Sequence, residues 1–167
     1  MLFSPAPSRC QGFSASVDHR ADKLLALLGA ERVLKGDDSR RLWRGVRDAE
    51  FLAEPRERAV WRVGVKPSRA VECLARLGPR ALAHLFDCGG GLVWLSTGPT
   101  PADAAALRAA LAPLGGHATL VRAPDALRAV VDVFPPQPPA LMALTRRVKA
   151  AFDPDGVFNP GRMYRGI

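Results

Sequence analysis

The sequence predicts an α+β fold in which a four-stranded antiparallel sheet carries two helices on one face. Residues 59–122 contain four short stretches with apolar residues at alternate positions and two longer stretches with apolar residues at helical spacing. Glycine or proline lies at the junctions between them. The glycine run 89–91 leaves no room for a helix between its flanking strands, which predicts a hairpin. The resulting order, β-α-β-β-α-β, is that of the ferredoxin-like split βαβ unit.

Two helices are expected before the sheet. Residues 1–16, rich in proline, serine and glycine, predict a flexible lead-in, and 17–58 are assigned to an N-terminal helical part of the fold. The expected elements in order are a helix capped by Asp18 that ends at Gly29, a strand at 31–34, a second helix capped by Asp37-Asp38-Ser39, and a charged loop at 51–58.

The sheet unit is assigned to 59–123, and a C-terminal helical part with its tail to 124–167. In the sheet unit the expected order is a strand at 59–65, a helix opened by Pro67, strands at 80–87 and 92–97, a helix at 102–114 and a strand at 117–122. After it we expect a short helix near 125–130, a proline-rich crossing at 134–139 and a final helix at 140–152.

The composition excludes several classes of protein. Of the 167 residues 48% are hydrophobic, which argues against global disorder, yet no apolar stretch approaches the roughly 20 residues of a membrane span. No signal peptide is expected, and three scattered cysteines suit a reducing compartment. The net charge of +8 would permit nucleic-acid binding, but the arginines are spread among acids, so we expect no nucleic acid. Small carboxylates or an acidic partner suit the same charge.

The expected sheet has one face covered by helices and one open face. If the small aliphatic residues of each strand face the helices, the other set faces outward. This set contains a guanidinium that suits a carboxylate, two imidazoles and an aromatic ring, so it predicts the lining of a cleft; a solvated face or a packing surface for another domain remains the alternative. The expected cleft residues are Arg62, His84, Trp94, His117 and Thr119.

No metal site and no catalytic side chain are assigned. The histidines lack a matching carboxylate pattern for zinc, and the glycine run 89–91 sits in a hairpin rather than at the start of a helix that could hold phosphate. The cysteines have no cationic neighbour pattern that would mark a nucleophile.

The tail is the most strongly punctuated segment of the chain. Pro154 disfavours helical geometry at Asp153, so the final helix ends there. Gly156 suits a turn, and the run Asn159-Pro160-Gly161-Arg162 places a narrow backbone beside a planar, permanently charged guanidinium.

This tail resembles the C-terminal signature of FAD-linked oxidases of the vanillyl-alcohol-oxidase type, in which Asp-Pro-x-Gly is followed by two apolar residues and Asn-Pro-Gly-Arg/Lys. Within that type the chain is similar to the FAD-binding (E-type) subunits of bacterial glycolate oxidases, and the likeness covers most of the chain from about Leu24. The other segments that carry it are Leu42-Trp43, Arg47-Asp48, Val60-Trp61-Arg62-Val63, 87–95, 115–120 and 138–142.

The resemblance implies the cap portion of a flavoprotein that oxidises glycolate, or another 2-hydroxy acid, to the 2-oxo acid. It implies FAD, shared with an N-terminal flavin-binding domain that lies outside this sequence, with Asn159, Gly161 and Arg162 nearest the cofactor and Arg62 at the substrate carboxylate. It also implies partners, a catalytic flavoprotein and an iron–sulfur subunit, in a cytoplasmic complex with or without peripheral contact to the inner membrane. Cys88 and Thr145 depart from the family pattern, where an aromatic residue and a histidine are usual.

Two other hypotheses stay open at this point. A stand-alone ferredoxin-like module that binds a ligand or nucleic acid would give salt-sensitive binding by the chain alone. A truncated remnant without function would be poorly soluble, because it would expose an interface that lacks its partner.

Overall fold

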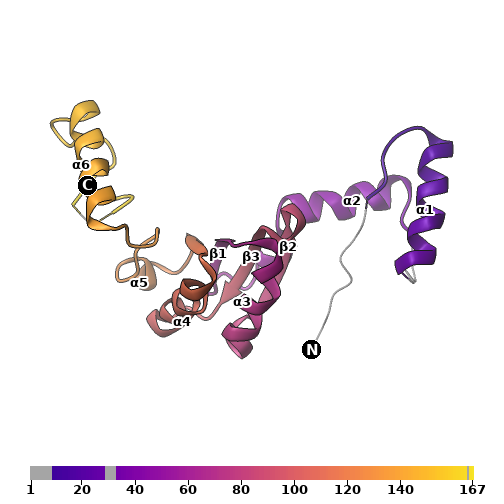
Figure 1. Cartoon of the computed structure of the whole chain (residues 1–167), viewed down its shortest axis with the longest axis horizontal. Helices are drawn as coiled ribbons and strands as arrows, with labels where there is room; N and C mark the ends of the chain where they lie inside the picture. The colour runs from indigo at the N-terminus through magenta and orange to yellow at the C-terminus, as the bar shows by residue number, and fades with distance from the viewer. Residues whose placement is uncertain (1–8, 29–32, 165) are drawn as a thin grey trace. The chain divides into compact units, whose positions relative to one another are not determined.

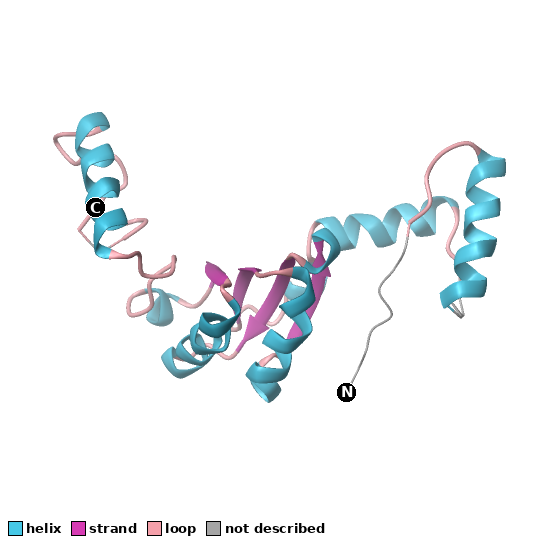
Figure 2. Ribbon diagram, viewed as in Figure 1, coloured by secondary structure: helices cyan, strands magenta, loops and turns pink. Residues whose placement is uncertain are grey.

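The residues that a computed structural model describes, 9–28, 33–164 and 166–167, fall into two compact units, Met1–Asp48 and Ala49–Ile167. Figures 1 and 2 show the helices and strands of each unit. Most of the expected flexible lead-in, residues 1–8, lies outside the described part of the chain, as do Gly29 and the first half of the strand expected at 31–34.

The first unit contains two helices, α1 (Ser14–Leu28) and α2 (Gly36–Arg47). α1 begins before Asp18, so the cap expected there is wrong, and Asp18 instead pairs with Lys35 at 3.4 Å. The N-cap of α2 is Lys35, whose side chain makes no cap hydrogen bond, while Asp37 and Asp38 lie in the first turn, where the helix dipole favours acids. Val33 and Leu34, the described half of the expected strand, form no strand.

The second unit is built on one four-stranded sheet, which confirms the α+β class. Its strand order is β2-β3-β1-β4, and every neighbouring pair is antiparallel. The strands are β1 (Ala59–Gly64), β2 (Ala83–Asp87), β3 (Leu92–Thr97) and β4 (His117–Arg122). The helices are α3 (Ala70–Leu77), α4 (Pro101–Leu111), α5 (Asp125–Arg128) and α6 (Pro139–Phe152). Short 3-10 turns are η1 (Glu50–Leu52), η2 (Pro67–Arg69), η3 (Gly78–Arg80), η4 (Cys88–Gly90) and η5 (Ala112–Leu114).

Local chemistry explains the bounds of the two helices that pack on the sheet. Thr100 is the N-cap of α4: its hydroxyl accepts from the backbone N–H of Asp103 at 3.2 Å and donates to the carboxylate of Asp103 at 2.5 Å. Pro101 occupies the first turn of α4, where the missing N–H costs nothing. α3 ends at Gly78, which takes a φ of 58° that other residues rarely adopt.

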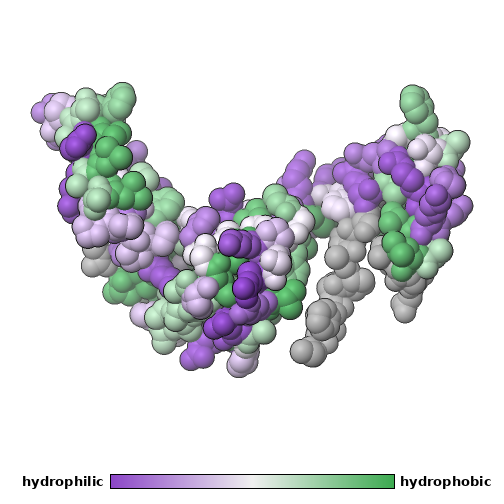
Figure 3. Space-filling view, in the orientation of Figure 1, coloured by the Kyte–Doolittle hydropathy of each residue, from purple (hydrophilic) through white to green (hydrophobic). Residues whose placement is uncertain are grey.

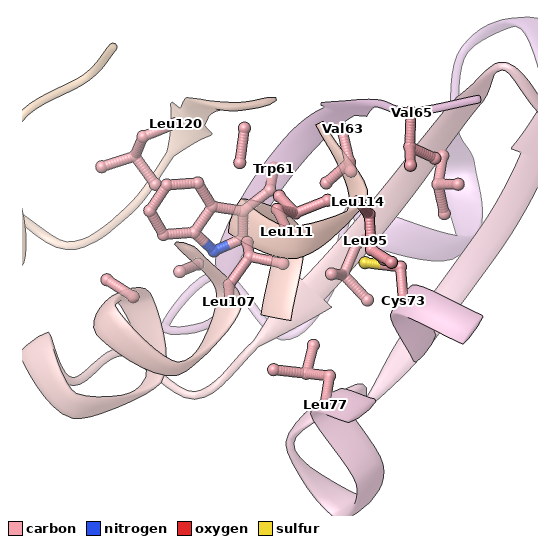
Figure 4. Close-up of a cluster of buried hydrophobic side chains, with 14 of the residues drawn as sticks. Trp61, Val63, Val65, Cys73, Leu77, Leu95, Leu107, Leu111, Leu114 and Leu120 are labelled. Atoms are coloured by element: carbon pink, nitrogen blue, oxygen red, sulfur yellow. The ribbon is translucent and has the colours of Figure 1, made fainter. Parts of the chain in front are cut away.

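The hydrophobic core lies between one face of the sheet and the helices α3 and α4 (Figure 4). Trp61 of the central strand β1 is fully buried there, and its Nε1–H donates to the hydroxyl of Thr97 on β3 at 3.0 Å. The Arg108 guanidinium of α4 lies 6.0 Å from the centre of the Trp61 ring. The other large buried side chains are Val63, Cys73, Leu77, Val93, Leu95, Leu107, Leu111 and Leu120.

The opposite face of the sheet is covered at one end only. η1 lies against β2 at one edge, and Arg122 of β4 donates to the carbonyls of Leu52 and Ala53, both at 2.7 Å, so this segment crosses the face. Val60 and Ser96 belong to this face by their strand positions, and both are buried, as is Leu52. Among the described residues, no other segment makes such contacts with the rest of this face.

The same contacts move the boundary between the two parts of the fold. The sequence assigned 17–58 to the helical part, but residues 49–58 group with the sheet unit, because Arg122 holds this segment by its backbone carbonyls. Carbonyl groups carry no side-chain signature, so the sequence pattern does not reveal this attachment.

α6 buries none of its residues. Leu141, Leu144, Val148 and Phe152 recur at helical spacing and are between 46% and 84% exposed, and Figure 3 shows apolar side chains grouped along this helix. Its stability as an amphipathic helix therefore calls for a partner surface. No helix among the described residues has the length and apolar character that crossing a membrane requires.

Replacing Trp61 by Phe should destabilise the second unit by about 1–3 kcal/mol, because it removes the hydrogen bond to Thr97 and leaves a void in the core. Urea unfolding followed by circular dichroism measures the change. Trp94→Phe is the matched control: Trp94 is only partly buried and makes no hydrogen bond with a described residue, so it should cost less than about 1 kcal/mol. Equal losses in the two variants would contradict this account of the core.

Candidate functional site

The uncovered part of the sheet presents a row of side chains from neighbouring strands. Arg62 of β1 pairs directly with Trp94 of β3 on one side and with Thr119 of β4 on the other. Directly opposite residues in an antiparallel pair point to the same face, so these three side chains lie beside one another. The next row along the strands contains Gly64, with Leu92 and His117 as its partners. Four of the five residues predicted for a cleft are thus brought together.

Arg62 is the charged centre of this row. Its side chain is exposed and makes no hydrogen bond or ion pair with any described residue. The Trp94 indole beside it is half-buried, and its Nε1–H is likewise not bonded to a described residue. A planar guanidinium that is free to bind, next to an aromatic face, can hold a carboxylate through two parallel hydrogen bonds. The arrangement therefore suits a small anion bound against a flat group.

His84 is the exception, and its predicted place on the open face is wrong. In the β2–β3 register His84 pairs with Leu95, which is fully buried in the core, so His84 lies on the helix-covered side. Its exposure arises because β2 is an edge strand. The His84 ring meets Phe86 edge-on, with 5.4 Å between ring centres, and partial desolvation lowers the pKa of its imidazole.

Asp153, directly after the last residue of α6, holds the tail through hydrogen bonds to its backbone. Its side chain is only 5% exposed. One carboxylate oxygen accepts from the N–H of Val157 at 2.9 Å, the other from the N–H of Phe158 at 2.9 Å. The Lys149 ammonium, one turn earlier, pairs with the same carboxylate and also donates to the Phe158 carbonyl at 2.5 Å. These bonds lower the pKa of Asp153, with the Lys149 contact the largest cause.

These bonds of Asp153 hold the backbone just before the three residues that are predicted to contact the cofactor. Asn159 and Gly161 both take left-handed backbone angles, with φ of 48° and 70°, and the N–H of Arg162 donates to the Asn159 carbonyl at 3.2 Å. All three residues are exposed. A hollow of about 360 Å³ opens between α6 and the tail, with Arg146, Lys149 and Gly161 in its lining. A smaller hollow of about 70 Å³ joins Gly161 and Arg162 to the α5 region, and no open-face residue lines either hollow.

Three residues of these sites escaped prediction from the sequence. The sequence pattern marks Asp153 as the end of a helix, and its spacing of four from Lys149 is also a signal for an ion pair. Gly64, a glycine inside a strand pattern, is a signal for close approach of another group. The role of Arg122 has no sequence signal, because it binds backbone carbonyls.

Neither site has the composition of a metal centre. Within residues 9–28, 33–164 and 166–167, no three His, Cys, Asp or Glu side chains lie close enough together to hold a metal ion. Cys73 is buried in the core, and burial raises the pKa of its thiol, while Cys88 is exposed at the β2–β3 turn. Thr145 is one of the two departures from the family pattern. Its hydroxyl lies 3.0 Å from Oε1 of Gln137 and 3.0 Å from the Leu141 carbonyl oxygen, which share its single proton.

Comparisons with known proteins bear directly on the tail. Residues 137–163 match the family described as FAD linked oxidases, C-terminal domain. The chain is also 31% identical over 138 residues to the glycolate oxidase subunit GlcE of Escherichia coli (strain K12). That alignment covers 83% of this chain and 34% of GlcE, so the chain spans about a third of the length of this relative. No solved structure matches. The resemblance predicted from the sequence is confirmed.

Asp153→Asn should loosen the tail, because an amide holds Lys149 and the two backbone N–H groups less strongly than a carboxylate does. Hydrogen-exchange protection of Val157 and Phe158 measures the change, and Asp155→Asn in the exposed turn is the matched control. The pKa of Asp153 is lower in the folded chain than its ordinary value. The carboxylate therefore stabilises the folded tail fully above the ordinary aspartate pKa, and this stabilisation is lost as the pH falls through the lowered pKa.

The pH dependence gives the sharper version of the same test. In the unmodified chain the protection factors of these two amides should fall in acid, and in Asp153→Asn they should be low at every pH. If Val157 and Phe158 keep full hydrogen-exchange protection in Asp153→Asn, the Asp153 carboxylate does not hold the tail and this account is wrong.

Proposed function

We propose, from the premise that this chain carries the C-terminal portion of an FAD-linked oxidase, that it forms the substrate-capping part of a glycolate oxidase subunit. The reaction would be the oxidation of glycolate, or of another small 2-hydroxy acid, to the corresponding 2-oxo acid. The identity to GlcE over most of the chain supports this role and favours it over a stand-alone binding module.

The observation that carries the proposal is the pair of Arg62 and Trp94 on the uncovered sheet face. The Arg62 guanidinium is positively charged and forms no ion pair or hydrogen bond with any described residue. It therefore suits the carboxylate that every 2-hydroxy acid contains. Trp94 and Thr119 flank it at the same level of the sheet. A substrate held by its carboxylate at Arg62 would lie over this row, against whatever flat group covers the face.

The tail has features that fit FAD as the group held there. A Cβ at Gly161 would meet no atom within 4 Å, so the backbone is open to close approach by a ligand. The Arg162 guanidinium makes no hydrogen bond with a described residue and suits a phosphate. Asn159, Gly161 and Arg162 would therefore contact the cofactor. When bound, FAD supplies the chemistry of accepting a hydride from the hydroxy-bearing carbon.

The exposed apolar side chains of α6 support an assembly with other protein. Leu144, Val148 and Phe152, together with Val157 and Phe158 of the tail, would be covered by a flavin-binding part that lies outside this sequence. Further partners would be the other subunits of a glycolate oxidase, a catalytic flavoprotein and an iron–sulfur protein. We propose a cytoplasmic complex, with or without peripheral contact to the inner membrane.

Co-expression with an FAD-binding portion and the partner subunits should give a yellow complex that reduces a dye in the presence of glycolate. In that complex Arg62→Gln should raise the KM for glycolate about 10–100-fold, because the charge-assisted pair to the carboxylate is lost. Arg56→Gln is the matched control, since Arg56 is exposed and its guanidinium reaches Glu54 at 3.4 Å. A complex that stays colourless and inert, or one in which both variants behave alike, would count against the proposal.

A further inference from the structure

Gly64 leaves a gap in the open face of the sheet, and the imidazole of His117 lies in that gap. The two residues are direct partners across β1 and β4. A Cβ built on Gly64 would lie 2.5 Å from Cε1, 2.8 Å from Nε2 and 3.2 Å from Nδ1 of His117. Real contacts of a Cβ are essentially never closer than 3.0 Å. The ring therefore occupies the space that any side chain at this position would take.

The backbone does not explain this glycine. Gly64 is absent from the positions with left-handed φ, so an L-residue could adopt its conformation, and glycine inside a strand is unfavourable by about 0.5–1 kcal/mol relative to alanine. The space for His117 is the feature that requires it. A glycine in a strand commonly marks a place where another group approaches the backbone.

This position places the His117 ring next to the row of side chains formed by Arg62, Trp94 and Thr119. Arg62 and Gly64 are two residues apart on β1 and face the same way, as do Thr119 and His117 on β4, which separates the rows by about 7 Å. Neither ring nitrogen of His117 is bonded to a described residue. Both side chains are exposed on the same face, so the hydrogen-bonding groups of both remain available to one small molecule bound there.

We propose that Gly64 is a positioning residue, which holds the His117 imidazole beside Arg62 so that the two side chains bind one small 2-hydroxy acid. Arg62 takes the carboxylate, and His117 forms a hydrogen bond with the hydroxyl group. This proposal rests on the proposed function, and it adds a second anchor that places the hydroxyl end of the substrate beside Gly64.

A double-mutant cycle in the assembled oxidase tests the proposal, with glycolate as substrate. Gly64→Ala and His117→Ala should each raise the KM about 5–10-fold, with kcat changed less than about twofold, because an anchoring hydrogen bond to the substrate is lost. In the His117→Ala background, Gly64→Ala should have no further effect, since the ring that it displaces is gone. His117→Gln, which keeps a donor and an acceptor, should restore part of the affinity.

Two controls separate this role from a general effect on the fold. His84→Ala removes the other histidine of the sheet, which lies on the opposite face, and should leave the KM unchanged. In the 167-residue chain, the NMR signals of the His117 ring should shift in Gly64→Ala while those of His84 stay in place. The added methyl meets only the end of a side chain, so the variant should fold.

Several outcomes would overturn the proposal. If Gly64→Ala raises the KM equally with and without His117, glycine acts through the backbone and the proposal is wrong. If the Gly64 and His117 variants match the unmodified oxidase while Arg62→Gln still raises the KM, the proposal fails and the proposed function stands. An assembled oxidase that does not oxidise glycolate at all would overturn the proposed function and this inference with it.

Discussion

Burial of the Trp61 ring beneath the central strand is the interaction on which the rest of the sheet unit depends. Trp61 packs against α4 and ties β1 to β3 through Thr97, which fixes the face that β1 turns toward the helices. Because side chains alternate along a strand, that choice also fixes the direction of Arg62 and Gly64. The burial of Trp61, the largest fully buried side chain among the described residues, therefore determines both the packing of the core and the side of the sheet on which the candidate site lies.

The tail follows a different principle, since its order comes from polar bonds rather than from a core. The buried carboxylate of Asp153 satisfies two backbone N–H groups beyond the helix end and neutralises Lys149. A polar group buried in this way is stabilising only when it is fully hydrogen-bonded, which this one is. The arrangement gives the segment that begins at Asn159 a defined starting point even though α6 buries nothing.

Both regions leave surface uncovered, and the two surfaces differ in kind. The sheet face around Arg62 is charged and aromatic, which suits a small ligand, whereas α6 presents aliphatic and aromatic side chains that suit protein. The alignment with GlcE covers about a third of that protein, and the proposed function assigns the second surface to a flavin-binding part outside this sequence. The excess of arginine over acid on such a chain is consistent with an anionic ligand at the first.

The sequence by itself determined the order of strands and helices from β1 to α6, the end of α6 and the likeness to FAD-linked oxidases, because turn chemistry and apolar periodicity act over a few residues. It did not determine the start of α1 or the expected strand near Val33. It also predicted that Arg62, Trp94, His117 and Thr119 share a face. Only the tertiary structure decided the face of His84, because β2 is an edge strand with no fully buried residue, and its pattern therefore carries no direction. Two other contacts also join residues far apart in sequence: His117 lies against Gly64, and Arg122 binds the carbonyl of Leu52. Such contacts follow from strand register and packing, which local sequence patterns do not specify.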